Sequence, residues 1–455
     1  MEDKVQVQVT IISNELVKPS SPTPPHLKTH TLSYVDQMVP LPPLFPTCGI
    51  AFYTPTTTPL NIPHLKSTLS ETLTRFYPVA GRVTQSTIMC DDRGVPFIET
   101  RVDSNISSVL DSPGKLDVMF KFLPPRESLK IADFGFAHLS IQVNVFACGG
   151  VAIGWYDIHK VMDGLSSASF FKHWASLAQA QPRPETMAQP KPDFESGLAV
   201  FPPVSEYKPL MSFDGLKGVQ LGPPPAVKRF VFRNGCVSRL KEMAGSEKVG
   251  KPSRFMAVAG FIWEQAFRAS QEAVKLMQGD EAEDTVLQVT LDMRSRLNPP
   301  LSKSTMGNLA TIAIVRAEKR AKLPDFVAEI DNSISNLNNK IKEYKGDKGV
   351  EGIRENWNNL MEISSIYKEK SYKLVSWCRL GFNELDFRFG KPELVVPTDG
   401  IISPLQRNVI ILNDYSSDVD GDGDGIEAWL FLEEKEMEIL ECNQEFLDFA
   451  SPLLL

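Results

Sequence analysis

A histidine and an aspartate stand four residues apart in the segment IHKVMDG, residues 158–164. Histidine can act as a general base near neutral pH, because its unperturbed pKa is about 6.5. His159 is therefore a candidate to remove a proton from a substrate, and Asp163 is a candidate to support it. A structural interpretation also fits these residues. His159 would be a structural histidine whose hydrogen bonds are satisfied within the protein, and Asp163 would cap a helix that begins near Gly164.

The segment lies where a strand gives way to a helix. Residues 139–161, LSIQVNVFACGGVAIGWYDIHKV, are rich in β-forming residues and are broken by two adjacent glycines. Residues 163–180, DGLSSASFFKHWASLAQA, repeat apolar residues at helical spacing. Strand ends of α/β proteins commonly border the ligand cleft, so we expect this junction to face one.

The whole chain has the composition of a globular protein. Its 455 residues, 42% hydrophobic and 23% charged, are too many for one ordinary core and favour two domains or two lobes. A net charge of -8 and the lack of a long Lys/Arg run argue against nucleic-acid binding. The sequence shows neither a secretory signal nor the roughly 18 apolar residues needed to span a bilayer. We therefore expect a cytoplasmic protein.

No metal site is expected. The six cysteines (Cys48, Cys90, Cys148, Cys236, Cys378 and Cys442) form no CxxC pair and no zinc-like spacing, which favours reduced thiols. The acidic run SSDVDGDGDGIEAW places Asp418, Asp420, Asp422 and Gly423 at four positions of a calcium loop. The twelfth position falls on Trp429, or on Phe431 in the other register, instead of the required Glu.

Proline divides the chain. Residues 186–226 include QPKPDF, FPPVSEYKP and LGPPPAV, a density that predicts a crossover without regular secondary structure. We therefore expect an N-terminal lobe over residues 1–185, this crossover, and a C-terminal lobe over residues 227–455.

Several segments together resemble one enzyme family. HKVMDG resembles the HxxxDG block of the BAHD acyltransferases, a plant family that moves acyl groups from coenzyme A thioesters to alcohols or amines. Five other segments resemble further parts of the family sequence and occur in the same order. They are VKPSSPTPPHLKTHTLSYVDQ, LTRFYPVAGRV, MRSRLNPPL, MGNLATIA and SWCRLGFNELDFRFGKP. The resemblance runs over nearly the whole chain.

The resemblance implies a fold and a reaction. The fold would be a two-lobed, chloramphenicol-acetyltransferase-like α/β fold with mixed sheets and a channel between the lobes. His159, midway along the channel, would be the general base for acyl transfer from acyl-CoA, most simply acetyl-CoA, to a hydroxyl of a plant metabolite such as an alkaloid. No metal or permanently bound cofactor would be needed, and the family favours a monomer.

The resemblance also implies supporting roles. The Asp163 side chain would turn away from the channel and pair with an arginine, either Arg294 or Arg296. Asp386 would likewise be an arginine-paired structural residue. Residues 376–400, which hold Asp386, would lie at the interface between the lobes.

The chain departs from the family at its second signature. It reads Asp386-Phe387-Arg388-Phe389-Gly390 where the family has DFGWG. Arg388 replaces a glycine, which matters if the position needs a positive φ, and Phe389 lacks the indole N–H of tryptophan. We expect this loop, Gly390 included, to influence coenzyme A affinity or lobe packing.

The residues before the histidine are also unusual for the family. Alternation along a strand would place Trp155, Asp157 and His159 on one side. Trp155 and Asp157 would then narrow or polarise the channel; the alternative is that both pack beneath the sheet without touching a substrate.

Two other functions remain compatible with these departures. The chain could use His159 for a rearrangement or cyclisation without coenzyme A. It could also be a catalytically silent protein that binds a small molecule. Turnover without a thioester would indicate the first, and ligand binding without turnover the second.

Overall fold

The structure is a computed structural model that describes residues 7–39, 46–84, 86–110, 116–131, 135–160, 162–179, 190–205, 224–277, 279, 282–366, 370–398, 408–415 and 425–453. The acidic run at residues 418–423 lies outside the described residues, and so does much of the expected crossover, at 186–189 and 206–223.

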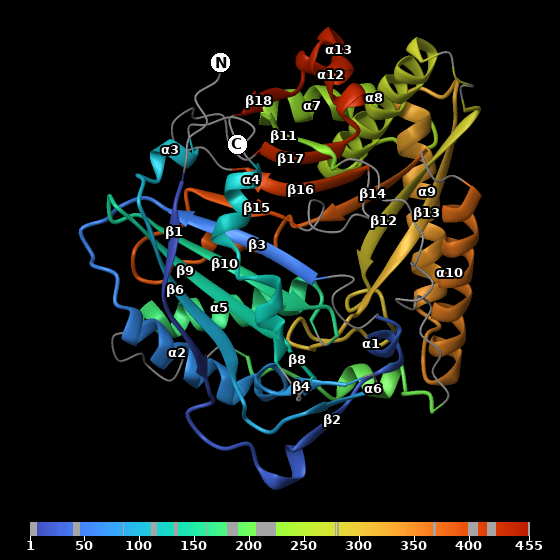
Figure 1. The fold of residues 1–455 in the computed structure, drawn as a ribbon. Coiled ribbons are helices and arrows are strands. Elements are labelled where there is room, and N and C mark those ends of the chain that lie inside the picture. Colours follow the sequence, from blue (N-terminus) through green and yellow to red (C-terminus); the bar gives the residue numbers. More distant parts are fainter. Residues whose placement is uncertain are drawn as a thin grey trace.

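A six-stranded sheet forms the first lobe. Its spatial order is β1 (Val9–Val17), β6 (Val95–Val102), β9 (Leu139–Phe146), β10 (Val151–Ile158), β3 (Pro46–Tyr53) and β15 (Leu394–Pro397). Helices α2 (Ile62–Arg75) and α5 (Gly164–Gln179) pack on one face of this sheet and on each other (Figure 1). Leu65, Leu69 and Leu73 recur at helical spacing and are buried, which explains why α2 forms against this core.

A seven-stranded sheet forms the second lobe. Its order is β13 (Ala310–Glu318), β12 (Asp284–Asp292), β14 (Ser371–Ser376), β16 (Val409–Tyr415), β17 (Gly425–Leu432), β11 (Ala226–Phe232) and β18 (Ser451–Leu453). The longest helix, α8 (Arg254–Leu276), contacts α7 (Asn234–Met243), α9 (Leu323–Ile341) and α12 (Glu434–Glu441). Helix α10 (Asp347–Ile366) lies along the outer side of β13 (Figure 1).

Shorter elements complete the fold. A five-stranded sheet runs in the order β2 (Thr29–Thr31), β5 (Thr87–Met89), β4 (Arg82–Val83), β8 (Gly135–Ala137) and β7 (Lys130–Ile131). The remaining α-helices of the described ranges are α1 (Tyr34–Met38), α3 (Ser107–Leu110), α4 (Leu116–Met119), α6 (Ser196–Val200) and α13 (Gln444–Leu447).

One segment of the C-terminal half crosses into the first lobe. Strand β15 pairs with β3 at the edge of the first sheet, with Leu394 opposite Phe52. The hydroxyl of Tyr53 donates a 2.8 Å hydrogen bond to the carbonyl of Leu385. The expected C-terminal lobe, residues 227–455, therefore contributes a strand and part of its 376–400 segment to the core of the N-terminal lobe.

The crossover is more regular than its proline content predicts. The expectation of no regular structure over residues 186–226 is wrong for its described part, because α6 occupies Ser196–Val200. The five residues of α6 contain no proline, so nothing in their backbone prevents a single helical turn.

Candidate active site

His159 follows directly after β10, at the point where that strand ends. Its Nδ1 lies 2.8 Å from Oδ1 of Asn308. The Asn308 Nδ2 group donates to the carbonyl of His159 at 2.7 Å and to Oδ1 of Asp36 at 2.9 Å. Because Nδ2 is committed to these oxygens, Oδ1 is the atom that faces the ring and it must accept a hydrogen bond. Nδ1 therefore carries the proton, and Nε2 keeps its lone pair.

A buried carboxylate holds Asn308 in this orientation. Asp36 of α1 also accepts a 2.7 Å bond from the backbone N–H of Asn308, and both the backbone N–H and the hydroxyl of Ser33 donate to it. Burial raises the pKa of the Asp36 carboxyl, while these hydrogen bonds oppose the rise. Sequence reasoning missed both Asp36 and Asn308, although each lies in a segment that carried the family resemblance.

Lys160, the neighbour of His159, binds the backbone of α1. Its ammonium donates to the backbone carbonyls of Asp36 and Gln37, at 3.2 and 3.1 Å. Burial lowers the pKa of Lys160 to about 8, and the nearby charge of Asp36 opposes the change. Lys160 thus ties the loop after β10 to α1.

Asp163 pairs with Arg294 in the interior. Two hydrogen bonds join the carboxylate to Nη1 and Nη2 of the guanidinium, at 2.8 and 3.1 Å. The same carboxylate accepts from the backbone N–H of Ser166 at 2.9 Å, so Asp163 also caps α5, which begins at Gly164. Arg296 instead donates to the side chain of Asn338 and to the carbonyl of Asp292. Arg294 is the arginine that faces Asp163.

The loop at residues 386–390 packs against β3 and α5. Asp386 Oδ1 accepts from the backbone N–H groups of Arg388 and Gly390, at 2.8 and 3.0 Å. Among the described residues no arginine pairs with Asp386, so that expectation is wrong there; backbone N–H groups of its own loop bond to one of its oxygens instead. The ring of Phe389 packs edge-on against Tyr53, 4.8 Å away.

A cavity of about 240 Å³ opens beside His159, between the two lobes. Thr47, Trp155 and Ser167 line it from the first lobe, and Thr290, Val375 and Ile411 line it from the second sheet. Asp163 and Gly164 also border it. A larger hollow of about 1020 Å³ lies elsewhere on the first lobe and is lined by Tyr156 and Lys121, but it contains no candidate residue.

The two unusual residues before the histidine differ in their placement. Trp155 lines the cavity, whereas Asp157 lies beside it, fully buried, and is not part of the lining. Burial raises the pKa of Asp157, and the Thr47 hydroxyl, neighbouring His159 and the Ser167 hydroxyl oppose the rise. Asp157 therefore adds a buried acidic group behind the wall of the cavity.

The described residues hold no group of three or more His, Cys, Asp or Glu side chains placed to bind a metal ion. Among the helices of the described ranges, none is long and apolar enough to cross a membrane.

Comparison with known proteins gives consistent matches. The sequence model of the Transferase family matches residues 7–447. Stemmadenine O-acetyltransferase from Catharanthus roseus is 33% identical over 96% of this chain and 97% of its own length. Limonoid 21-O-acetyltransferase from Melia azedarach is 31% identical over 98% of this chain and 99% of its own length. The crystal structure of vinorine synthase gives a TM-score of 0.77 at 29% identity and covers 97% of this chain and 98% of that one.

The fold and the site define a two-lobed α/β transferase with a cavity between its lobes. The chain belongs to the Transferase family, the BAHD acyl-CoA-dependent acyltransferases. It is an enzyme that transfers an acyl group from acyl-CoA to a small molecule. The fold class and the family resemblance predicted from the sequence are confirmed.

Proposed function

We propose that this enzyme transfers an acetyl group from acetyl-CoA to a hydroxyl of an alkaloid, with His159 as the general base. The observation that carries the proposal is the hydrogen bond from Nδ1 of His159 to Asn308, which leaves Nε2 free to accept a proton in the cavity. The relatives named stemmadenine O-acetyltransferase and limonoid 21-O-acetyltransferase support an acetyl donor and a plant acceptor. We further propose that the enzyme is a cytoplasmic monomer.

The proposed reaction has one tetrahedral intermediate. The acceptor hydroxyl gives its proton to Nε2 of His159 while its oxygen attacks the thioester carbonyl carbon. The oxyanion then collapses, the C–S bond breaks, and the imidazolium returns the proton to the thiolate of coenzyme A. Binding both substrates in the cavity supplies the required proximity, so no covalent acyl-enzyme is needed.

Asp163 and Arg294 have a supporting role in this proposal. Their bidentate pair joins the first turn of α5 to the segment after β12. The pair therefore fixes the loop that presents His159 and does not touch the reacting atoms.

The first experiment is calorimetric titration of the wild-type protein and its His159→Ala variant with acetyl-CoA. Both proteins should bind, because His159 acts on the acceptor proton and not on the donor. Release of coenzyme A thiol is then followed with a panel of alkaloid and limonoid alcohols. Turnover of the variant should be about 10²- to 10⁴-fold slower, the usual contribution of a positioned base.

His64→Ala is the matched control, because the His64 ring bonds to the carbonyl of Ala178 and does not line the cavity. It should keep wild-type turnover. A folded wild-type protein that does not bind acetyl-CoA would refute the proposed donor, and undiminished turnover by His159→Ala would refute the proposed base.

A further inference from the structure

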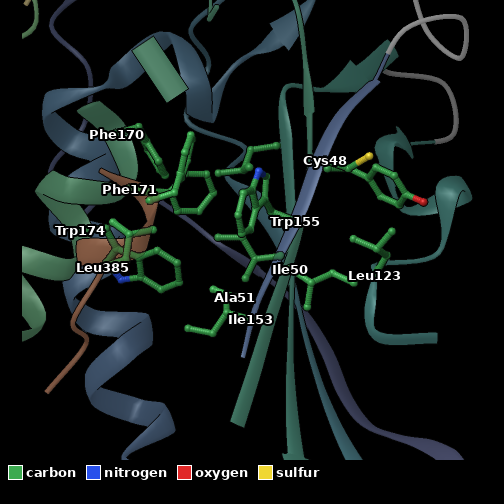
Figure 2. Close-up of a cluster of buried hydrophobic side chains, with 14 of the residues drawn as sticks. Cys48, Ile50, Ala51, Leu123, Ile153, Trp155, Phe170, Phe171, Trp174 and Leu385 are labelled. Atoms are coloured by element: carbon green, nitrogen blue, oxygen red, sulfur yellow. The ribbon is translucent and has the colours of Figure 1, made fainter. Parts of the chain in front are cut away.

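Trp155 forms part of the cavity wall close to His159. It lies on β10, four residues before the histidine, and its side chain is 2% exposed. Figure 2 shows its indole on the side of the strands that carries Phe170, Phe171 and Trp174. The ring therefore separates the cavity from the aromatic core beneath α5.

The strand beside Trp155 is shaped for this ring. Gly49 of β3 is the cross-strand partner of Trp155. A Cβ atom at Gly49 would lie only 2.4 Å from Cζ2 of the indole, so any larger residue there would displace the ring. The tryptophan and the glycine thus form a complementary pair, in which the indole occupies the space that a side chain at residue 49 would fill.

Aromatic contacts from both halves of the chain fix the indole. Phe171 of α5 packs against it with ring centroids 4.7 Å apart. Phe382, which begins the short 3₁₀ helix η7 (Phe382–Glu384), stacks on it at 5.7 Å with an interplanar angle of 18°. Phe171, Phe382 and the backbone of Gly49 thus surround the indole on three sides. Because the interior is close-packed, the ring cannot rotate away from them at low cost in free energy. Trp155 is therefore a rigid part of the wall.

The size and position of the cavity indicate which substrate group meets this wall. The acceptor oxygen must lie within hydrogen-bond reach of His159, and the donor carbonyl carbon must lie about 3–3.5 Å from that oxygen. The group attached to this carbon must consequently lie beside His159 as well. The cavity holds about 240 Å³, below the roughly 300–1,000 Å³ of common ligand pockets.

We propose that Trp155 limits the donor to short acyl chains: the acetyl group fits beside the indole, and bulkier acyl groups collide with it. This inference rests on the proposed function, because it requires an acyl donor at His159. It adds a specificity-determining residue to that function.

The test uses acetyl-CoA, hexanoyl-CoA and benzoyl-CoA as probes in calorimetric titrations, so no acceptor is needed. Wild-type protein should bind acetyl-CoA at least about tenfold more tightly than benzoyl-CoA, in line with the 10- to 200-fold discrimination that apolar pockets achieve. Trp155→Leu should reduce this ratio at least about tenfold by opening space next to Gly49. Trp155→Phe, a milder change, should give an intermediate ratio.

Phe170→Leu is the matched control, because Phe170 belongs to the same aromatic core but does not line the cavity. It should leave the ratio unchanged, and circular dichroism should show that all variants are folded. Equal binding of acetyl-CoA and benzoyl-CoA by the wild-type protein would overturn the inference. An unchanged ratio in folded Trp155→Leu would also overturn it, even if that variant accepted larger alcohols. If the wild-type protein binds none of the three thioesters, the proposed function itself fails.

Discussion

The orientation of the His159 ring depends on Asn308, a residue 149 positions further along the chain. Asn308 is itself oriented by Asp36, from the opposite end of the sequence. This arrangement selects the tautomer that a general base needs, with Nε2 free. It also places the Asp36 carboxylate two hydrogen bonds away from the ring, through Asn308. The proposed base, His159, thus depends on two positioning side chains, Asn308 and Asp36, and neither of them belongs to the HxxxDG block.

Asn308→Ala should lower the turnover number by about 10²-fold, because the ring loses the acceptor that keeps its proton on Nδ1. The affinity for acetyl-CoA should change less than twofold. Steady-state kinetics and calorimetric titration measure the two quantities separately. Asn338→Ala is the control, since Asn338 binds Arg296 away from the cavity. Equal losses in both variants would argue against a specific role for Asn308.

At the scale of elements, the loop at residues 386–390 shows how a departure from the family is accommodated. Arg388 has φ 83°, in the left-handed region that favours glycine. Its side chain is exposed, and Asp386 stabilises the turn by accepting two backbone N–H bonds. The arginine is therefore tolerated at the cost of backbone strain, and the loop keeps its shape.

Arg388→Gly should raise the free energy of unfolding by about 0.5–1 kcal/mol. Relief of left-handed strain contributes about 1–2 kcal/mol, and the greater freedom of glycine in the unfolded chain offsets part of it. Urea denaturation measures the change. Arg316→Gly, on the exposed face of β13, should instead lower the free energy of unfolding, because glycine weakens a strand. A destabilised Arg388→Gly variant would contradict this account of the loop.

At the scale of the whole molecule, the two halves of the chain are joined at several places. Arg294 and Asp163 form a buried ion pair between the lobes, with side chains that are 1% and 7% exposed. Strand β15 completes the edge of the first sheet, and Tyr53 bonds to the carbonyl of Leu385. The cavity lies between the joined lobes, so its shape depends on both of them.

Arg294→Met should lower the free energy of unfolding by about 3–5 kcal/mol, because it leaves the Asp163 carboxylate buried without its partner. Arg296→Met removes hydrogen bonds at a more exposed position and should cost about 1 kcal/mol. Urea denaturation at pH 7 compares the two variants. Similar losses would mean that the Asp163 pair has no special part in holding the lobes together.

The family, the α/β class and the position of His159 at a strand-to-helix junction were all predictable from the amino-acid sequence. These features are local: hydrophobic periodicity and short motifs depend on residues that are neighbours along the chain. A positive φ at residue 388 was foreseeable in the same way, because the family motif has a glycine at that position.

The folded structure was needed to show that Arg294 rather than Arg296 faces Asp163, that backbone N–H groups bond to Asp386, and that Asn308 and Asp36 orient His159. It also separated Trp155, which lines the cavity, from Asp157, which lies behind its wall. The partners of Asp386 are local, but the other choices depend on how the two lobes pack. The pairs His159–Asn308 and Asp163–Arg294 are separated by 149 and 131 residues, so spacing along the chain cannot predict them. Their contacts exist only once the lobes have closed around the cavity.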